Sequence, residues 1–192
     1  MRLATYIYYP NFLSKKECKR ITKEGTINLE KGKINPASPH KLKEVRDTKV
    51  SFIHEGSVVQ DLMIKIMKRL DSCASKYYGC DLTYTEPIQY AEYTKGMFYN
   101  WHTDSVTKIN DPQNLKRDIS ASLILNHSKK YTGGSLELIT GACKYKKDTI
   151  IPEKAIDQEQ GTLIVFPSSM LHRVTKVKSG VRKSLVLWSA AK

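Results

Sequence analysis

The second half of the chain, from about residue 82, is built of short apolar segments that turn residues separate. In order, the segments are EPIQYAEY, MFYNWH, DISASLILN, GGSLELI, GTLIVFP, LHRVTKV and RKSLVLWS. No helical pattern lies between them, and many short strands in succession are typical of an antiparallel sandwich or barrel. This pattern of short apolar segments constrains the fold more than any other feature, and it predicts a β core over residues 82–190.

The first eighty residues carry two helix signals. Ser14 and Glu17 form a capping box, which predicts a helix that begins there. Residues 57–79 place apolar side chains at helical spacing and end at Gly79, which predicts one amphipathic helix. The positions expected in the core, methionines included, are Val59, Leu62, Met63, Ile66, Met67, Leu70 and Ala74.

Three other segments complete the N-terminal part. Residues 3–10 and 45–53 predict strands, and residues 31–44, which are polar and contain two prolines, predict a loop. No internal repeat or second domain boundary is evident. The sequence therefore predicts a mainly β (α+β) fold in one domain over residues 1–192, with helical support up to about residue 80.

A histidine and a carboxylate stand two residues apart in MFYNWHTDS. Residues i and i+2 of a strand project from the same face, so His102 and Asp104 can offer a nitrogen and an oxygen to one ion. His172 is the best candidate for a third ligand, because it follows an apolar strand and can close over the pair in a sandwich. Two histidines and one carboxylate form the facial triad of non-haem Fe(II) oxygenases. The remaining histidines are expected to be exposed: His40, His54 and His127.

An arginine follows His172 by ten residues. A turn at residues 179–180 would let two antiparallel strands bring Arg182 back alongside His172. A guanidinium can bind a carboxylate through two parallel hydrogen bonds. Arg182 is therefore suited to the far end of a dicarboxylate cosubstrate.

The chain is strongly basic, with 32 Lys and Arg against 19 Asp and Glu and a formal net charge of +13. Such an excess attracts polyanions or acidic protein surfaces, or it is simply a solvated lysine-rich surface. The basic residues are spread along the chain, which argues against a dedicated nucleic-acid role.

The sequence shows no sign of export or membrane insertion. No apolar run approaches the ~20 residues of a membrane span, and no apolar segment with a cleavage site opens the chain. The cysteines form no CxxC pair and are expected to be free thiols in a reducing cytosol. They are Cys18, Cys73, Cys80 and Cys143. A cytoplasmic location without a membrane partner is expected.

Five segments carry a family resemblance in their order and spacing: YTKGMFYNWHTD, RDISASLILN, YTGGSLEL, GTLIVFPSSMLHRV and SGVRKSLVLW. With the opening YPNFLSKKECKRI, the chain resembles the Fe(II)- and 2-oxoglutarate-dependent dioxygenases of the prolyl 4-hydroxylase-like branch, and especially the PKHD-type hydroxylases. The resemblance covers most of residues 5–190. It implies a double-stranded β-helix, or jelly-roll, core with the N-terminal helices packed on one sheet.

The resemblance also implies ligands and their residues. It implies that His102, Asp104 and His172 bind Fe(II) and are catalytic. It implies that Arg182 and Tyr93 bind the distal carboxylate of 2-oxoglutarate, the cosubstrate. Ascorbate would keep the iron reduced, and O₂ would be the oxidant.

Two further positions follow from the same alignment. Ser120 stands where relatives place a hydroxyl residue near the cosubstrate, although a shift of two residues would make it Ser122. Trp188 would form a wall of the pocket, with ordinary core packing as the alternative. For Tyr93 the alternative is a sheet tyrosine that points outward.

The residues beside these positions are expected to be structural. Tyr99 and Trp101 flank the ligand pair and are expected to be packing or rim residues. Arg117 is expected to be a surface charge. Residues 133–134 predict a hairpin turn, which the resemblance places at the edge of the active-site mouth.

The implied reaction is hydroxylation of a C–H bond with release of succinate and CO₂. Asp104 favours hydroxylation over halogenation, since halogenases generally lack this carboxylate. The favoured target is a peptidyl proline, and an acidic protein partner would suit the charge. Residues 31–44 and 106–116 are the expected substrate-contacting loops.

Two alternatives remain open. A nucleic-acid demethylase uses the same iron and cosubstrate, but those that repair alkylated bases have a second arginine six residues after the cosubstrate arginine, where this chain has Trp188. A non-enzymatic β-sandwich binding module would have lost its site, whereas all four polar site residues are present. The oligomeric state is not indicated.

Overall fold

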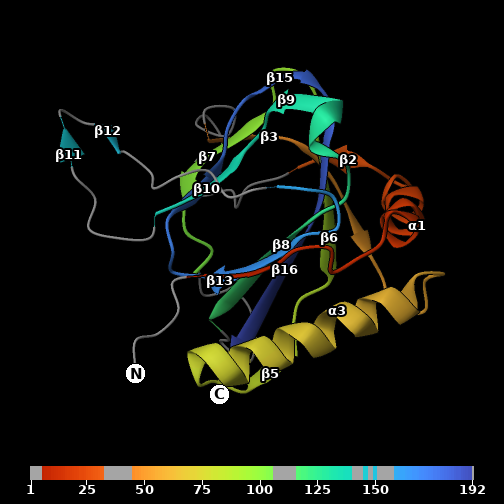
Figure 1. Ribbon diagram of the computed structural model, residues 1–192, viewed down its shortest axis with the longest axis vertical. Coiled ribbons are helices and arrows are strands. Elements are labelled where there is room, and N and C mark those ends of the chain that lie inside the picture. Colours follow the sequence, from red (N-terminus) through yellow and green to blue (C-terminus); the bar gives the residue numbers. More distant parts are fainter. Residues whose placement is uncertain are drawn as a thin grey trace.

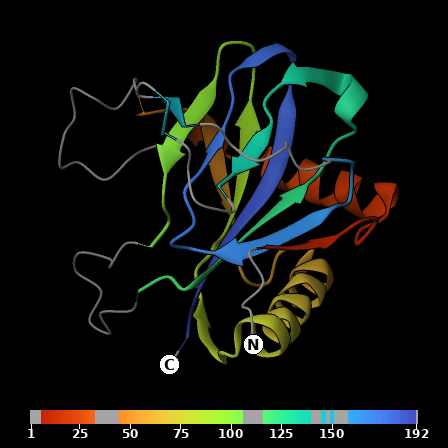
Figure 2. The ribbon, with the colours of Figure 1, turned by 60° about the vertical axis from the view of Figure 1, so that its left-hand side comes forward.

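The computed structural model describes residues 6–32, 45–105, 116–139, 145–146, 149–150 and 158–191. Within them, two antiparallel sheets face one another, and two helices cover the outer side of the larger sheet (Figures 1 and 2). This arrangement confirms the predicted mainly β jelly-roll fold with N-terminal helices packed on one sheet.

The larger sheet has eight strands, and β5 lies off its main order. Its strands, in spatial order, are β1 (Ile7–Tyr9), β13 (Leu163–Pro167), β8 (Ile119–Ile124), β16 (Arg182–Ala191), β6 (Ile88–Tyr93), β4 (Lys49–Ile53) and β2 (Glu30–Lys31), while β5 (Leu82–Thr85) pairs with β16.

The smaller sheet has four strands. They are β10 (Leu136–Leu138), β14 (His172–Val174), β7 (Phe98–His102) and β3 (Arg46–Asp47). Two short ribbons complete the β structure: β15 (Val177–Gly180) pairs with β9 (Tyr131–Gly133), and β11 (Tyr145–Lys146) pairs with β12 (Thr149–Ile150). One turn of 3₁₀ helix, η3 (Ser128–Lys130), directly precedes β9.

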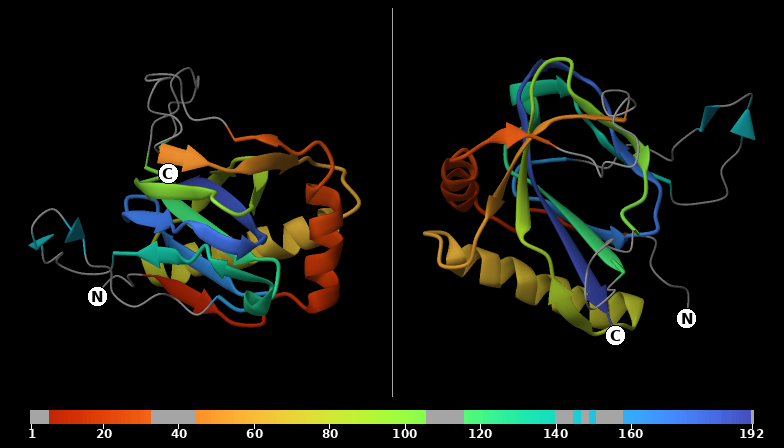
Figure 3. Two further views of the ribbon diagram at one scale, coloured as in Figure 1. Left: turned by 90° about the horizontal axis from the view of Figure 1, so that it is seen from above. Right: turned by 180° about the vertical axis from the view of Figure 1, so that it is seen from behind.

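The helices α1 (Lys15–Gly25) and α3 (Gln60–Cys73) cross the outer face of the larger sheet (Figure 3). The capping box predicted at Ser14 is present, with the hydroxyl and the Glu17 carboxylate each bonded to the other's backbone. A π-helical turn, η2 (Ala74–Tyr78), extends α3, and Gly79 ends it in the left-handed conformation. The predicted helix is confirmed, but it begins three residues late because residues 57–60 form a turn closed by the backbone N–H of Gln60.

The core positions predicted on α3 are buried with one exception. Met67 is 37% exposed, because it lies at the margin of the face that packs on the sheet. A core cluster between the helices and the outer face includes Leu123 of β8 and Leu187 of β16. A second cluster lies between the two sheets and includes Tyr93 and Phe166.

One predicted strand is wrong in its extent. Residues 45–53 form two strands in different sheets, β3 in the smaller and β4 in the larger. Thr48 lies between them, fully buried, and its hydroxyl donates to the backbone carbonyl of Glu92 at 3.1 Å. This bond holds the chain where it crosses from one sheet to the other.

Parts of three predictions lie outside the described residues. They are the start of the strand predicted over 3–10, and nearly all of both predicted substrate loops, at 33–44 and 106–115.

The histidines outside the ligand set differ from one another. His54 is exposed, as predicted. The side chain of His127 is 37% exposed, in keeping with the prediction, but its Nδ1 accepts the backbone N–H of Lys129 at 3.1 Å, so it is not free of structural contacts. His127 thus caps the 3₁₀ turn η3. His40 lies outside the described residues.

The three described cysteines, Cys18, Cys73 and Cys80, are free thiols, and Cys143 lies outside the described residues. Among the helices of the described segments, none is long and apolar enough to cross a membrane.

Candidate metal centre and active site

Two neighbouring strands of the smaller sheet bring the predicted ligands together. His102 of β7 and His172 of β14 are direct partners in the antiparallel register, and their ring centroids lie 4.1 Å apart. The register shifts just beyond this pair, where Val174 meets Tyr99, so the strand carries a bulge beside the site. The bulge lets Tyr99 stack on the His102 ring at 3.5 Å between centroids.

Asp104 completes a compact set of three donors. Its two carboxylate oxygens lie 3.6 Å from His102 Nε2 and 3.4 Å from His172 Nε2. One donor atom from each residue lies within 4.8 Å of the other two. Two imidazole nitrogens and one carboxylate oxygen at this spacing can share one ion.

The ring nitrogens that do not face the site are already bonded. His102 Nδ1 lies 2.7 Å from the backbone carbonyl of Asn100, and His172 Nδ1 lies 2.9 Å from that of Met170. A carbonyl can only accept, so each Nδ1 carries the proton. Each Nε2 lone pair is therefore directed at the common centre, which is the tautomer that a metal requires.

A serine pair orients the carboxylate. Ser120 on β8 donates its hydroxyl to Asp104 Oδ2 at 2.9 Å and lies 2.8 Å from the Ser168 hydroxyl. Since the Ser120 proton goes to Asp104, Ser168 is the donor in the second bond. The backbone carbonyl of Ser168 also accepts the N–H of Asp104 at 2.8 Å.

Burial and charge set the protonation states of the centre. Burial, and the nearby His172, lower the pKa of His102 to about 4. Burial alone would raise the pKa of Asp104, but its contacts with His172 and His102 outweigh burial and hold that pKa below its usual range. At neutral pH the imidazole of His102 is therefore neutral and the carboxylate is charged, as metal ligands must be.

Arg182 faces the same cavity from the larger sheet. It is 1% exposed, and its Nη1 donates to the Ser184 hydroxyl at 2.8 Å. Its Nε and Nη2 are buried and bond to no described residue. The Tyr93 ring lies 5.4 Å from the guanidinium carbon and is also buried, so the outward-facing alternative for Tyr93 is excluded.

The route that brings Arg182 to the site differs from the prediction. Beyond the turn at 179–180 the chain does not return beside β14, because β15 pairs with β9 and β16 joins the larger sheet. Arg182 and His172 therefore face each other across the space between the sheets, and both line one cavity. The predicted hairpin is wrong, although both residues line the same cavity.

Residues 133–134 make a turn, but not the predicted hairpin. They connect β9 to β10, and these strands pair with different partners. Both glycines have positive φ, 69° and 64°. A Cβ at Gly134 would lie 3.1 Å from the Arg182 side chain, so glycine here leaves room for the guanidinium.

The remaining predicted positions lie around the cavity. Ser122 and Trp188 line it, whereas the Ser120 hydroxyl is turned to Asp104. Arg117 stacks over the Trp188 ring at 4.1 Å and makes two bonds of 2.7 and 2.8 Å to Glu86. Its side chain is only 19% exposed, so the prediction of a surface charge is wrong. The Glu86 ion pair draws it onto the back of the cavity wall.

Several residues that line or contact the site were not predicted from the sequence. Arg46 on β3 lines the cavity, lies 4.8 Å from the centroid of Tyr99 and has a buried Nε without a described partner. Phe166 packs its edge on His172 at 4.9 Å between centroids. Trp101 points elsewhere and stacks under Arg173 at 4.5 Å. The strand that carries Arg46 has only two residues, and so short a strand leaves no pattern that would assign it to the smaller sheet.

The matching region of known proteins coincides with this site. A family model of the 2OG-Fe(II) oxygenase superfamily matches residues 88–190, more than half of the chain. The chain belongs to the 2OG-Fe(II) oxygenase superfamily. The family resemblance drawn from the sequence is confirmed, and the matched residues include the three candidate metal ligands and Arg182.

Two relatives within this superfamily are PKHD-type hydroxylases. The one from Thermosynechococcus vestitus is 35% identical over 102 residues, which cover 53% of this chain and 42% of the relative. The one from Hyphomonas neptunium is 28% identical over 133 residues, which cover 69% of this chain and 54% of the relative. The chain thus matches about half the length of these relatives.

Solved structures share the fold of this oxygenase domain. A prolyl-4-hydroxylase from Pseudomonas putida superposes with a TM-score of 0.72, 21% identity and coverage of 98% of this chain and 93% of that one. A viral collagen prolyl hydroxylase from Paramecium bursaria Chlorella virus-1 superposes with a TM-score of 0.69, 20% identity and coverage of 98% and 97%. At these identities the likeness establishes the jelly-roll fold.

Proposed function

We propose that this chain is an Fe(II)- and 2-oxoglutarate-dependent dioxygenase, in a single domain, that hydroxylates a peptidyl proline and releases succinate and CO₂. The observation that carries the proposal is Arg182. A fully buried guanidinium with two unpartnered nitrogens is costly, and no carboxylate of the described residues pairs with it. A dicarboxylate bound at the His-Asp-His centre would satisfy it.

The donor set fits the metal. Two imidazole nitrogens and one carboxylate oxygen suit Fe(II), and three protein ligands leave positions open for a cosubstrate and O₂. When bound, Fe(II) and 2-oxoglutarate supply the oxidising chemistry that attacks a C–H bond. Ascorbate is the proposed reductant that keeps the iron in its ferrous state.

The protein's own residues would orient these groups and keep them dry. Ser120 holds the Asp104 carboxylate, and the backbone carbonyls of Asn100 and Met170 hold the two imidazoles. Arg182 would bind the distal carboxylate, with Tyr93 beside it. Apolar side chains of the intersheet cluster exclude water and so strengthen these polar contacts: Leu136, Phe166 and Val174.

The cavity holds about 40 Å³, room for roughly three water molecules. The cosubstrate would occupy this cavity, which both the candidate metal ligands and Arg182 line.

The names of similar proteins support the choice of proline. The relatives in sequence are PKHD-type hydroxylases, and one structural neighbour, from Trichoplax adhaerens, is a prolyl hydroxylase in complex with a peptide fragment of hypoxia inducible factor. A nucleic-acid demethylase is less well supported, because Trp188 occupies the position of that family's second arginine and lines the cavity.

Succinate release from 2-oxoglutarate tests the proposal. The Fe(II)-loaded protein should release succinate in the presence of proline-containing peptides, and mass spectrometry should find one added oxygen atom in the peptide. Lysine-containing peptides and an alkylated oligonucleotide are the comparison substrates. A protein that binds Fe(II) but never converts 2-oxoglutarate to succinate would contradict the proposed activity.

A further inference from the structure

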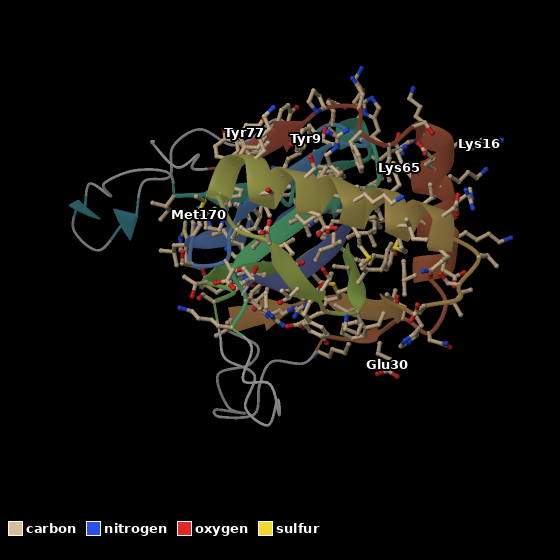
Figure 4. All side chains as sticks on the ribbon, turned by 90° about the horizontal axis from the view of Figure 1, so that it is seen from below. Tyr9, Lys16, Glu30, Lys65, Tyr77 and Met170 are labelled. Carbon is tan, nitrogen blue, oxygen red and sulfur yellow. The ribbon has the colours of Figure 1, made fainter. Side chains whose placement is uncertain are left out.

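A second cavity, of about 590 Å³, opens at the β2 edge of the larger sheet. It lies where the end of α1, β2 and β4 come together. We call it the edge groove, and its lining includes Glu24, Glu30, Phe52, Glu55 and Gln89. Figure 4 shows Glu30 projecting from this edge of the sheet.

The edge groove and the metal cavity share one face of the larger sheet. In the strand register, Val186 of β16 pairs with Gln89 of β6, and Gln89 pairs with Phe52 of β4. Directly paired residues project from the same face, so these three side chains form a row across the sheet. Val186 lines the metal cavity, Phe52 lines the edge groove, and Gln89 lines both. Gln89 is therefore the side chain that separates and borders the two cavities along this row.

Gln89 lies at the junction of the two cavities. It is only 4% exposed, yet its carboxamide bonds to none of the described residues. Among the described residues, its carboxamide is therefore free to bond to a ligand in either cavity. A carboxamide offers one acceptor and one donor group, and these match the N–H and C=O of a peptide backbone.

The edge groove combines an apolar surface with negative charge. Phe52 is 47% exposed, although its neighbours along β4 are buried. Among the described lining residues, three carboxylates, from Glu24, Glu30 and Glu55, stand against one ammonium group, that of Lys31. None of the three carboxylates forms an ion pair with a described residue. The groove is thus locally acidic in a chain of net charge +13.

We propose that the edge groove binds the substrate polypeptide on one side of its target residue and selects a lysine or arginine there. The inference rests on the proposed hydroxylase function. Gln89 would bond to the peptide backbone, Phe52 would pack on the apolar stem of the basic side chain, and the carboxylates would receive its charge. Phosphate groups of a nucleic acid would be repelled by the same carboxylates.

A peptide library tests the selection. The probe is a pool of peptides with five random positions on each side of a fixed proline. The peptides are captured on the whole 192-residue chain without added metal and are then sequenced. Lysine and arginine should be enriched about threefold on one side of the proline, the size expected for an exposed ion pair. Enrichment of Asp and Glu, which the net charge alone favours, or no positional enrichment, would overturn the proposal.

Two variants localise the effect. Glu30→Lys should abolish the enrichment of basic residues, while Asp71→Lys, the same charge change at an exposed position of α3, should preserve it. Gln89→Leu should weaken peptide capture severalfold at every sequence, because it removes backbone contacts. Equal enrichment in Glu30→Lys and wild type would overturn the assignment to this groove.

The outcome can be separated from the proposed activity. Protein that binds Fe(II) and releases succinate but shows no basic preference would overturn the edge-groove inference alone. Protein that captures basic peptides in the predicted manner but binds neither Fe(II) nor 2-oxoglutarate would overturn the proposed activity, while the groove would still bind polypeptide.

Discussion

Along β8, β16 and β6, side chains alternate between the helix-covered face of the larger sheet and the face that meets the smaller sheet. Leu123 and Leu187 point outward and pack on the helices. Ser120, Arg182 and Gln89 point inward, where each is buried as well. Both faces are thus buried, but they differ in composition. The outer face is apolar and supports the fold, whereas the inner face carries polar groups that bond to the metal centre or keep nitrogens without a partner among the described residues.

Burial alone therefore does not identify a residue whose role is structural. A buried polar group that lowers stability is tolerated where it serves a site. Substitutions on the two faces should therefore have opposite consequences: outer changes should cost stability, and inner changes should cost binding.

The largest effect is expected on the outer face. Leu187→Ala should lower the free energy of unfolding by about 2–5 kcal/mol, because Leu187 is fully buried in the core beneath the helices and truncation leaves a cavity. Urea unfolding measures it, and Val186→Ala, on the half-buried inner side of the same strand, is the control. A decrease in the free energy of unfolding of less than about 1 kcal/mol would contradict the conclusion that the outer face stabilises the fold.

Arg182→Met, on the inner face, should weaken ligand binding without lowering the free energy of unfolding. Affinity for 2-oxoglutarate should fall at least about a hundredfold, since one partner of a buried charge pair is removed. The free energy of unfolding should be unchanged or higher, because an unpaired buried charge is replaced by an apolar side chain. Calorimetric titration of the metal-loaded protein gives the first quantity and urea unfolding the second.

Arg173→Met is the matched control for that experiment, because Arg173 bonds only to Glu137 and Trp101 among the described residues. It should leave 2-oxoglutarate affinity unaltered. Equal losses in both arginine variants would show that the effect is one of overall charge.

Ser120→Ala should weaken metal binding by about 10–100-fold, the usual cost of removing a residue that orients a ligand. The reason is its 2.9 Å bond to Asp104 Oδ2. Ser122→Ala is the control two residues along the same face, since the Ser122 hydroxyl bonds to no described residue. Metal affinities that fall together in both variants would remove the special role of Ser120.

The smallest effect concerns the helix layer. The Glu17 carboxylate accepts a hydrogen bond from the Lys65 ammonium of α3 at 2.7 Å and closes the capping box of α1. These contacts, with the Lys65 bond foremost, lower the pKa of Glu17 from 4.5 to about 2. Glu17→Gln should cost about 1 kcal/mol at pH 7.

The pH dependence of that loss follows from the direction of the shift. A carboxyl whose pKa is lowered by folding stabilises the protein above pH 4.5, and this contribution disappears as the pH falls toward 2. Melting temperatures of wild type and Glu17→Gln should therefore differ at pH 7 and converge at low pH. A difference that grows on acidification would contradict the ion pair.

Much of the fold and the metal centre could be predicted because each depends on local pattern. Alternating apolar residues revealed the strands, and the His-x-Asp spacing with a distant His172 revealed the ligands. The crossing at Thr48 could not be predicted, because a strand pattern does not say which sheet a strand joins. The predicted path to Arg182 failed for the same reason.

The hydrogen-bond partners of the buried polar residues could not be predicted from the sequence either. Strand periodicity places Ser120 on the inner face, but only the packing of three segments shows that it meets Asp104 and Ser168. Gln89 did leave a signal, a carboxamide within the apolar strand IQYAEY, yet nothing in the pattern connects it to Phe52.

The central claim is that His102, Asp104 and His172 form one Fe(II) site, and anaerobic equilibrium dialysis with Fe(II) tests it most directly. The wild-type protein should bind one Fe(II) per chain, and Asp104→Ala, verified as folded by its near-ultraviolet circular dichroism, should lose that binding. Undiminished Fe(II) binding by folded Asp104→Ala, or none by the wild type, would contradict the account.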